Sequence, residues 1–205
     1  ADDKPEIQDL LIQLVKRARI IDLSHTWEIQ SPIAGVNPPY SFALAATHAN
    51  SRGTFGDGNQ LSFTSEVMHW SGQHGAPSID AIGHIGRDGK LFGGVDAAAS
   101  TSNQDGIGAG GVGAHLAIDK FPNELLVNRA VLLDVARWKN GDASPLTPGY
   151  EITAKDLEQT AKHFKVKVRR GDTVLIPTGW GPFFKSNAAF YAGAHSPGPG
   201  VEAAD

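Results

Sequence analysis

The chain has 205 residues, of which 40% are hydrophobic and 20% are charged, and its formal net charge is −4. These values are ordinary for one globular domain, and a negative charge without a basic run argues against nucleic acid or an anionic membrane surface as a partner. No apolar run approaches the ~18 residues that a membrane-spanning helix needs, and the absence of cysteine excludes disulfides and thiolate metal ligands.

The first predicted element is an amphipathic helix over residues 5–19. Its apolar side chains recur three and four positions apart, and Pro5 suits the first turn of a helix. These side chains are Ile7, Leu10, Leu11, Leu14 and Val15. We expect a short apolar strand over residues 20–23, followed by a loop that holds His25 and Trp27. Loops after strands often build binding sites, so these two residues are candidates for a substrate pocket, with a packed loop pair as the alternative.

Residues 31–58 are rich in proline, glycine and asparagine, which predicts a long loop with one strand near residues 41–47. The loose alternation of apolar and polar residues over 61–68 predicts a second strand. That strand leads into a stretch rich in glycine and proline, residues 71–84, and residues 87–90 then form a predicted turn.

Residues 106–111 match the G-x-G-x-x-G pattern of dinucleotide-binding proteins. Because no strand precedes this pattern and no helix follows it, we predict a flexible glycine loop and no nucleotide cofactor. Residues 115–120 are expected to form a short helix or strand.

Residues 130–135 and 173–176 have the continuous apolar character of buried strands. Between them, Thr153 with Asp156 three residues later is typical of a capped helix start, and this helix is predicted to run to Phe164. The alternation of strands and helices predicts an α/β or α+β fold with a partly parallel sheet.

The stretch over residues 71–84 carries the main chemical motif. His74, Ser78, Asp80 and His84 lie even numbers of residues apart and would share one face of a strand. Six residues of straight strand span about 20 Å, whereas metal ligands lie about 2.0–2.2 Å from their ion. His74 and Asp80 can therefore share an ion only where the chain folds back, which the glycine and proline between them allow. His84 is then the candidate general base or acid.

A serine nucleophile is the competing interpretation of the same stretch. Ser71 and Ser78 both lie in it, but the sequence contains no G-x-S-x-G nucleophile elbow. We therefore favour metal chemistry over a serine hydrolase.

This motif resembles that of the cyclase family of metal-dependent hydrolases, which includes kynurenine formamidase, isatin hydrolase and trans-dienelactone hydrolase. The family pattern H-x-G-T-H-x-D-x-P-x-H is matched by His74, Asp80 and His84, whereas Ser78 stands at the second histidine. Three other segments resemble family segments in the same order: residues 21–25, residues 171–180 ("GDxVLxxTGW") and residues 195–204 ("HxPGxxxEAA").

The resemblance implies a single domain over residues 1–205, lacking its C-terminal part. A mixed, partly parallel sheet or barrel-like β core would be flanked by helices, as in the family's swivelling β/β/α type. The resemblance also implies a divalent metal ion, Zn²⁺ or Mn²⁺, at His74 and Asp80, and a homo-oligomer, either dimer or tetramer. Glu202 falls where the family has an acidic ligand, and His195 belongs to the same segment. Ser78 is a weak candidate ligand because zinc sites are built from Cys, His and carboxylate side chains.

The predicted function is hydrolysis of a small amide, lactam or lactone by metal-activated water. A substrate like formyl-kynurenine or isatin is favoured, because Trp27, Phe55, Trp70 and Phe92 are available to surround an aromatic ring. The alternative is a relative that binds a small molecule without turnover, since Ser78 replaces a histidine. The first residue is alanine rather than methionine, which leaves both a cytoplasmic and an exported protein open and slightly favours export.

Overall fold

The computed structural model of the protein describes residues 7–33, 35, 40–69, 79–101, 116–193 and 195–203. Its α-helices are α1 (Ile7–Arg17), α2 (Ala97–Thr101), α3 (Val135–Asn140), α4 (Ala154–His163), α5 (Phe183–Ser186) and α6 (Ala188–Tyr191). Its strands are β1 (Ser41–Ala46), β2 (Ser65–His69), β3 (Ala130–Leu132), β4 (Glu151–Ile152), β5 (Thr173–Leu175) and β6 (Gly198–Pro199). Short 3₁₀ turns are η1 (Ile82–His84), η2 (Ile118–Lys120), η3 (Asn123–Leu125) and η4 (Val201–Ala203).

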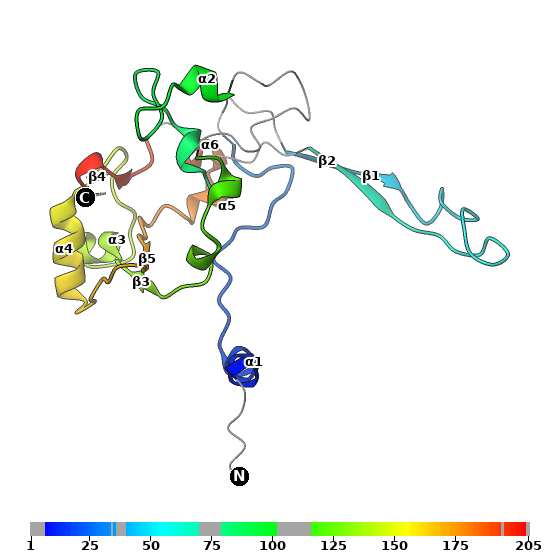
Figure 1. Cartoon of the computed structure of the whole chain (residues 1–205), viewed down its shortest axis with the longest axis horizontal. Coiled ribbons are helices and arrows are strands. Elements are labelled where there is room, and N and C mark those ends of the chain that lie inside the picture. Colours follow the sequence, from blue (N-terminus) through cyan, green and yellow to red (C-terminus); the bar gives the residue numbers. More distant parts are fainter. Residues whose placement is uncertain are drawn as a thin grey trace, which may run out of the picture.

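The strands confirm the predicted α/β class with parallel pairing. β1 pairs with β2 in antiparallel fashion, whereas β3 pairs with β5 and β4 with β6 in parallel. Over the described ranges these strands form three separate two-stranded sheets and no closed barrel. Figure 1 shows the two parallel pairs close to α3 and α4, with the β1–β2 hairpin extending away from them.

The parallel pair β3–β5 confirms the two predicted strands, but of their residues only Val131 is buried. The first strand ends at Leu132, before the predicted end at residue 135, because α3 begins there. Val131 lies opposite Val174, and Leu132 lies opposite Leu175. The Leu133 N–H extends the ladder by donating to the Leu175 carbonyl at 2.8 Å. Parallel strands need a long crossover between them, and here α3, β4 and α4 provide it.

Local capping interactions explain where α3 and α4 begin. The Asp134 side chain accepts a hydrogen bond of 3.0 Å from the Arg137 N–H at the start of α3. At α4, the Thr153 hydroxyl accepts from the Asp156 N–H, and the Asp156 carboxylate accepts from the Thr153 N–H. This reciprocal capping box confirms the predicted helix start at Thr153.

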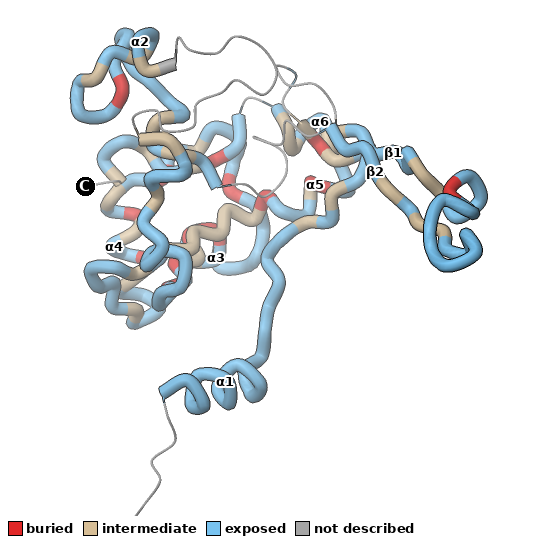
Figure 2. Tube along the Cα trace, turned by 45° about the vertical axis from the view of Figure 1, so that its right-hand side comes forward, coloured by how far each residue is buried: buried red, intermediate tan, exposed pale blue. Residues whose placement is uncertain are grey.

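The apolar core lies in the C-terminal half of the chain. It is built around four buried residues, and four partly buried side chains pack against them. The buried residues are Val135, Ala136, Leu146 and Ile152, and the packed ones are Trp138, Tyr150, Leu157 and Ile176. Figure 2 shows several buried segments around α3 and α4, whereas α1 is exposed along its length. The core therefore supports α4 and the two parallel strand pairs.

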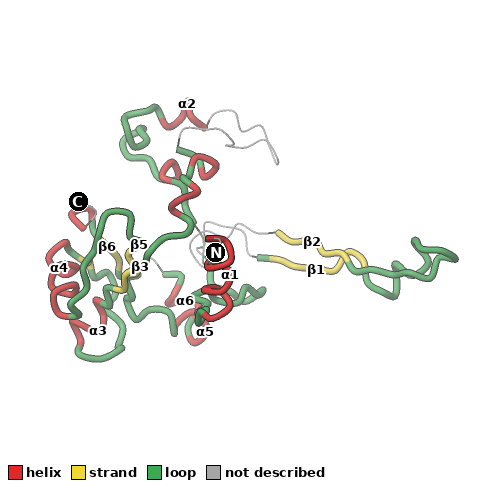
Figure 3. Tube along the Cα trace, turned by 60° about the horizontal axis from the view of Figure 1, so that its bottom comes forward, coloured by secondary structure: helices red, strands yellow, loops and turns green. Residues whose placement is uncertain are grey.

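The β1–β2 hairpin is mostly exposed and projects from the body in both Figure 1 and Figure 3. Phe42 lies opposite Met68, and the register shifts by one residue between Leu44 and Ala46. At its far end the buried Ser51 hydroxyl bonds to the Thr47 and Phe63 carbonyls, which closes the loop. The predicted strand near residues 41–47 is confirmed, and the second strand begins later than expected, at Ser65.

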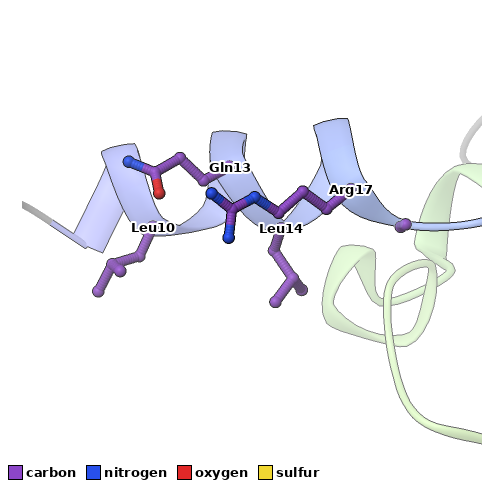
Figure 4. Close-up of a pocket in the computed structure, with 5 residues that line it drawn as sticks. Leu10, Gln13, Leu14 and Arg17 are labelled. Atoms are coloured by element: carbon purple, nitrogen blue, oxygen red, sulfur yellow. The ribbon is translucent and has the colours of Figure 1, made fainter.

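Helix α1 confirms the amphipathic pattern, but none of its residues is buried. Figure 4 shows Leu10 and Leu14 pointing to the same side of the helix, and their exposed fractions are 50% and 69%. The strand predicted over residues 20–23 is wrong, because this segment has no regular secondary structure and pairs with none of the described strands. An apolar run becomes a strand only where a neighbour completes its hydrogen bonds.

Candidate functional site

The chemical motif is described only from Ile79 onward, so His74, Ser78 and Trp70 lie outside the described residues. Asp80 precedes η1 and His84 ends it, and both residues are exposed. The His84 N–H donates to the Ala81 carbonyl at 2.9 Å, which closes the turn. The predicted irregular, turning backbone is confirmed for this part of the motif.

The later candidate ligands lie on either side of β6 in the sequence. His195 is exposed, and its carbonyl accepts a hydrogen bond of 2.6 Å from the Gly149 N–H. Glu202 lies in η4, which follows β6, and is also exposed. In the described ranges, no three His, Asp or Glu side chains come together as a possible metal site. The metal ligand set therefore stays a prediction from the sequence.

His25 contacts two aromatic residues from the C-terminal half. Its ring stacks on Phe184 with a centroid distance of 4.0 Å and an interplanar angle of 7°. Tyr191 meets the His25 ring edge-on at 6.4 Å, and burial raises the pKa of the Tyr191 phenol. His25 is only partly buried, so one side of its ring is packed while part of the side chain remains accessible.

Trp180 is a residue that the sequence reasoning used only as part of a family segment. It is 6% exposed, stacks on Phe190 at 4.8 Å and meets Phe183 edge-on at 5.4 Å. Its indole N–H has no acceptor among the residues that the structure describes. A buried donor without an acceptor is costly. The sequence signal that could have identified Trp180 is the Gly-Trp pair shortly before the aromatic residues of α5 and α6.

Gly179 sets the position of Trp180. Its φ is +73°, and a Cβ atom there would lie 2.6 Å from the Cα of Pro145. The carbonyl of Thr178 accepts from the Leu146 N–H at 2.9 Å, which holds the two segments together. Only glycine combines this backbone angle with this close approach.

The predicted aromatic pocket residues lie on three different segments. Trp27 meets Tyr40 edge-on at 6.3 Å, and Phe55 packs against Phe63 at 5.6 Å near the hairpin tip. Phe92 lies in a turn after Leu91 and is 75% exposed. Their grouping around one substrate stays a prediction.

A small cavity of about 180 Å³ lies between η1 and residues 116–125. Its walls are mainly apolar, and Lys120 contributes the one charged side chain among its lining residues. The apolar lining includes Ala81, Ile82, Leu116, Ile118, Phe121 and Leu125. This cavity places apolar surface directly beside the turn that carries His84.

A second hollow runs along α1 and is lined by Leu10, Gln13, Leu14, Arg17 and Ala18. All five residues come from one helix and its end, so no opposite wall encloses a ligand (Figure 4). Among the described helices, none has the length and apolar character required to cross a membrane.

Comparison with known proteins gives the family and the fold. Residues 21–205 match the model of the cyclase family, whose description is "Putative cyclase". No curated protein is similar enough in sequence to count as a match. A crystal structure described as a novel cyclase is 24% identical, with a TM-score of 0.72, over 97% of this chain and 64% of its own.

Two isatin hydrolase structures share the fold at lower identity. Isatin hydrolase A from Ralstonia solanacearum is 19% identical with a TM-score of 0.59, over 99% of this chain and 68% of its own. An isatin hydrolase bound to the product analogue thioisatinate is 17% identical with a TM-score of 0.57, over 96% of this chain and 65% of its own. The chain thus spans about two thirds of these solved chains. Because the family model covers nearly all of it, the protein belongs to the cyclase family.

Proposed function

We propose that the protein is a metal-dependent hydrolase that opens a small amide, lactam or lactone. The observation that carries this proposal is the family match over residues 21–205, which includes the motif positions His74, Asp80 and His84. The fold shared with isatin hydrolases supports it further. An aromatic cyclic amide like isatin, or an N-formyl aromatic amide, is the favoured substrate class.

In this proposal His74 and Asp80 hold one divalent ion, Zn²⁺ or Mn²⁺, with Ser78, His195 and Glu202 as further candidates. The ion would supply a water molecule that is acidic enough to react near neutral pH. The assignment rests on the sequence motif, since the described residues bring no three such ligands together.

The proposed role of His84 is proton transfer. In hydrolysis, a water oxygen bonds to the carbonyl carbon, the bond from that carbon to nitrogen or oxygen breaks, and the leaving atom takes up a proton. A histidine side chain exchanges protons near neutral pH, and a positioned acid or base contributes about 10²–10⁴-fold to such a rate. The exposed position of His84 at the end of η1 suits this role, because a proton carrier must reach the substrate.

Ser78 favours one alternative, a relative that binds a small molecule without turning it over. A serine hydroxyl is not among the usual zinc ligands, and the family pattern has histidine at this position. The alternative predicts no stoichiometric metal and no effect of a chelator on stability, because only a ligand bound to the folded state stabilises it.

Metal analysis combined with activity measurements distinguishes these two functions. The protein would be equilibrated with Zn²⁺ or Mn²⁺, dialysed, analysed for metal and assayed with isatin, formyl-kynurenine and a simple lactone. We expect bound metal in proportion to protein, and loss of metal and activity in His74→Ala and Asp80→Ala. In His84→Gln we expect metal to be retained while kcat falls by about 10²-fold or more.

His163→Gln is the matched control, because His163 is an exposed histidine on α4 that the proposal does not use. Its metal content and activity should equal those of the unmodified protein. A metal-free protein whose thermal unfolding is unaffected by EDTA, and which hydrolyses none of the three substrates, would leave the binding-only alternative standing.

A further inference from the structure

The cavity beside η1 is partly open to solvent, and the turns that line it are held together by backbone hydrogen bonds. The Gly83 N–H donates to the Leu116 carbonyl at 3.1 Å, which ties η1 to the opposite wall. On that wall, the Phe121 N–H donates to the Ile118 carbonyl at 3.0 Å, and the Leu125 N–H donates to the Pro122 carbonyl at 3.0 Å. The cavity is therefore part of the backbone arrangement rather than a gap left by one rotated side chain.

The cavity lining leaves apolar surface exposed to solvent. Ile82 is 61% exposed, Ile118 is 47% exposed and Leu125 is 42% exposed. The ammonium group of Lys120 pairs with the Asp119 carboxylate at 3.0 Å. The one charged side chain among the lining residues is therefore already in an ion pair. Concave apolar surface of this kind is where small apolar ligand groups bind.

The backbone at Leu116 provides a second sign of a functional site. Leu116 lines the cavity and has a φ of +58°, although it is not glycine. Side chains such as leucine rarely adopt this left-handed conformation, which persists where the surrounding structure imposes it and is frequent at ligand sites.

The cavity lies directly next to the residues of the chemical motif. Ala81 and Ile82 line it, Asp80 precedes them, and the hydrogen bond from the His84 N–H to the Ala81 carbonyl brings His84 back to the Ala81 end of the turn. A group bound in the cavity would therefore lie within one turn of both Asp80 and His84.

From this juxtaposition we propose that the cavity binds the six-membered ring of an aryl amide or benzo-fused lactam, with the bond to be cleaved outside it, beside Asp80 and His84. This inference rests on the proposed hydrolase function. The size of the cavity limits the bound group to about one ring. An apolar cavity of about 150 Å³ holds one benzene ring, so a cavity of about 180 Å³ accepts a single ring. The carbonyl group of a bicyclic lactam then remains outside.

The test fills the cavity from two walls and measures binding separately from catalysis. Leu125→Trp and Ile118→Trp each place an indole into the cavity, and Val127→Trp is the matched control, because Val127 is 90% exposed and does not line it. Binding of phenol as a one-ring probe is measured by ligand-observed NMR, and KM and kcat are measured with isatin. All variants are first compared with the unmodified protein by circular dichroism and thermal unfolding.

We expect both filling variants to lose phenol binding and to raise KM for isatin by about tenfold or more, while Val127→Trp changes neither. Should the filling variants fail to fold, Leu125→Ala widens the same cavity and should bind the two-ring probe 2-naphthol more tightly than the unmodified protein does. Phenol binding and KM that are unchanged in folded Leu125→Trp and Ile118→Trp would overturn the cavity assignment, as would 2-naphthol binding that is unchanged in Leu125→Ala.

The two proposals fail in different ways. A protein that hydrolyses isatin with a KM unaffected by either filling variant keeps the hydrolase function and loses the ring-binding cavity. A protein that binds phenol and loses this binding in Leu125→Trp, but that hydrolyses no amide or lactone, keeps the cavity and loses the hydrolase function.

Discussion

The Tyr150 hydroxyl donates a hydrogen bond of 2.8 Å to the Asp156 carboxylate, which joins the loop before β4 to the first turn of α4. The same carboxylate oxygen accepts from the N–H and the hydroxyl of Thr153, each at 3.0 Å. Lys139 lies over the Tyr150 ring, 4.4 Å from its centroid. One carboxylate on α4 thus links the helix cap to the residues that pack on the core.

Asp156→Asn should make stability less dependent on pH. Burial acts to raise the pKa of Asp156, but the hydrogen bonds from Thr153 and Tyr150 and the charge of Lys139 outweigh it, and the net pKa is lowered. An unfolded Asp titrates near 3.9. The ionised Asp156 carboxylate therefore contributes its full stabilisation above the unfolded-state pKa. This contribution is lost as the pH falls through the lower pKa of the folded state.

At pH 7 we expect Asp156→Asn to lower the free energy of unfolding by about 1.5–3 kcal/mol, the usual contribution of hydrogen bonds to a charged group. The deficit should shrink as the pH falls below about 4. Urea unfolding of Asp156→Asn and of the unmodified protein across the pH range measures this deficit. Glu158→Gln, an exposed carboxylate on the same helix, is the control, and an equal pH effect there would contradict the assignment.

Removing the Thr153 hydroxyl should weaken the start of α4. Thr153→Val keeps the shape of the side chain but loses the hydroxyl that accepts from the Asp156 N–H at 3.2 Å. We expect the free energy of unfolding to fall by about 1 kcal/mol, measured by chemical unfolding. Thr153→Ser keeps the hydroxyl and should remain near the original stability, so an equal loss in both variants would show that the cap is not responsible.

Gly179→Ala should be more destabilising than the same change at another glycine with positive φ. The added Cβ at Gly179 would lie 2.6 Å from the Cα of Pro145, a backbone atom, whereas at Gly149, with a φ of +72°, nothing lies within 4 Å. Both variants incur backbone strain of about 1 kcal/mol, and only the first adds a steric clash. Thermal unfolding of the two variants tests this, and equal losses would argue against the close approach to Pro145.

Ile152→Ala should create a cavity in the centre of the core. Ile152 is fully buried in β4 and belongs to the cluster with Val135 and Leu146. Truncation of a buried isoleucine lowers the free energy of unfolding by about 2–5 kcal/mol. Ile29→Ala, at a position that is 63% exposed, should have little effect. Denaturant unfolding that gives the same small change for both variants would place the core elsewhere.

Several elements could be predicted because their causes are local. The start of α4 depends on Thr153 and Asp156, which lie three residues apart, and the turn over residues 87–90 closes through hydrogen bonds between Arg87 and Lys90. Strands are recognisable from continuous apolar runs, and both β3 and β5 lie within the predicted ranges, although only Val131 among their residues is buried. The apolar run at residues 20–23 led to a wrong prediction, since none of the described strands pairs with it.

The candidate site also has features that the sequence predicts and features that only the folded chain shows. The motif positions His74, Asp80 and His84 and the order of the family segments are properties of the sequence. The match over residues 21–205 confirms the family that they predicted, whereas the roles of the three residues stay a prediction. No pattern in the sequence indicated that His25 would stack on Phe184, and the Gly-Trp pair at residues 179–180 did not by itself show which segment would bury Trp180. Both contacts depend on segments that meet only after the chain has folded.

The sequence by itself therefore determined the family, the capped helix α4 and the residues available for chemistry, because each depends on side-chain identity and short spacing. Only the tertiary structure decided that residues 116–125 close over η1 to form a ring-sized cavity beside Asp80 and His84. The reason is physical: a cavity is made by backbone hydrogen bonds and apolar contacts between distant segments, and no periodicity within one segment encodes which other segment will lie against it.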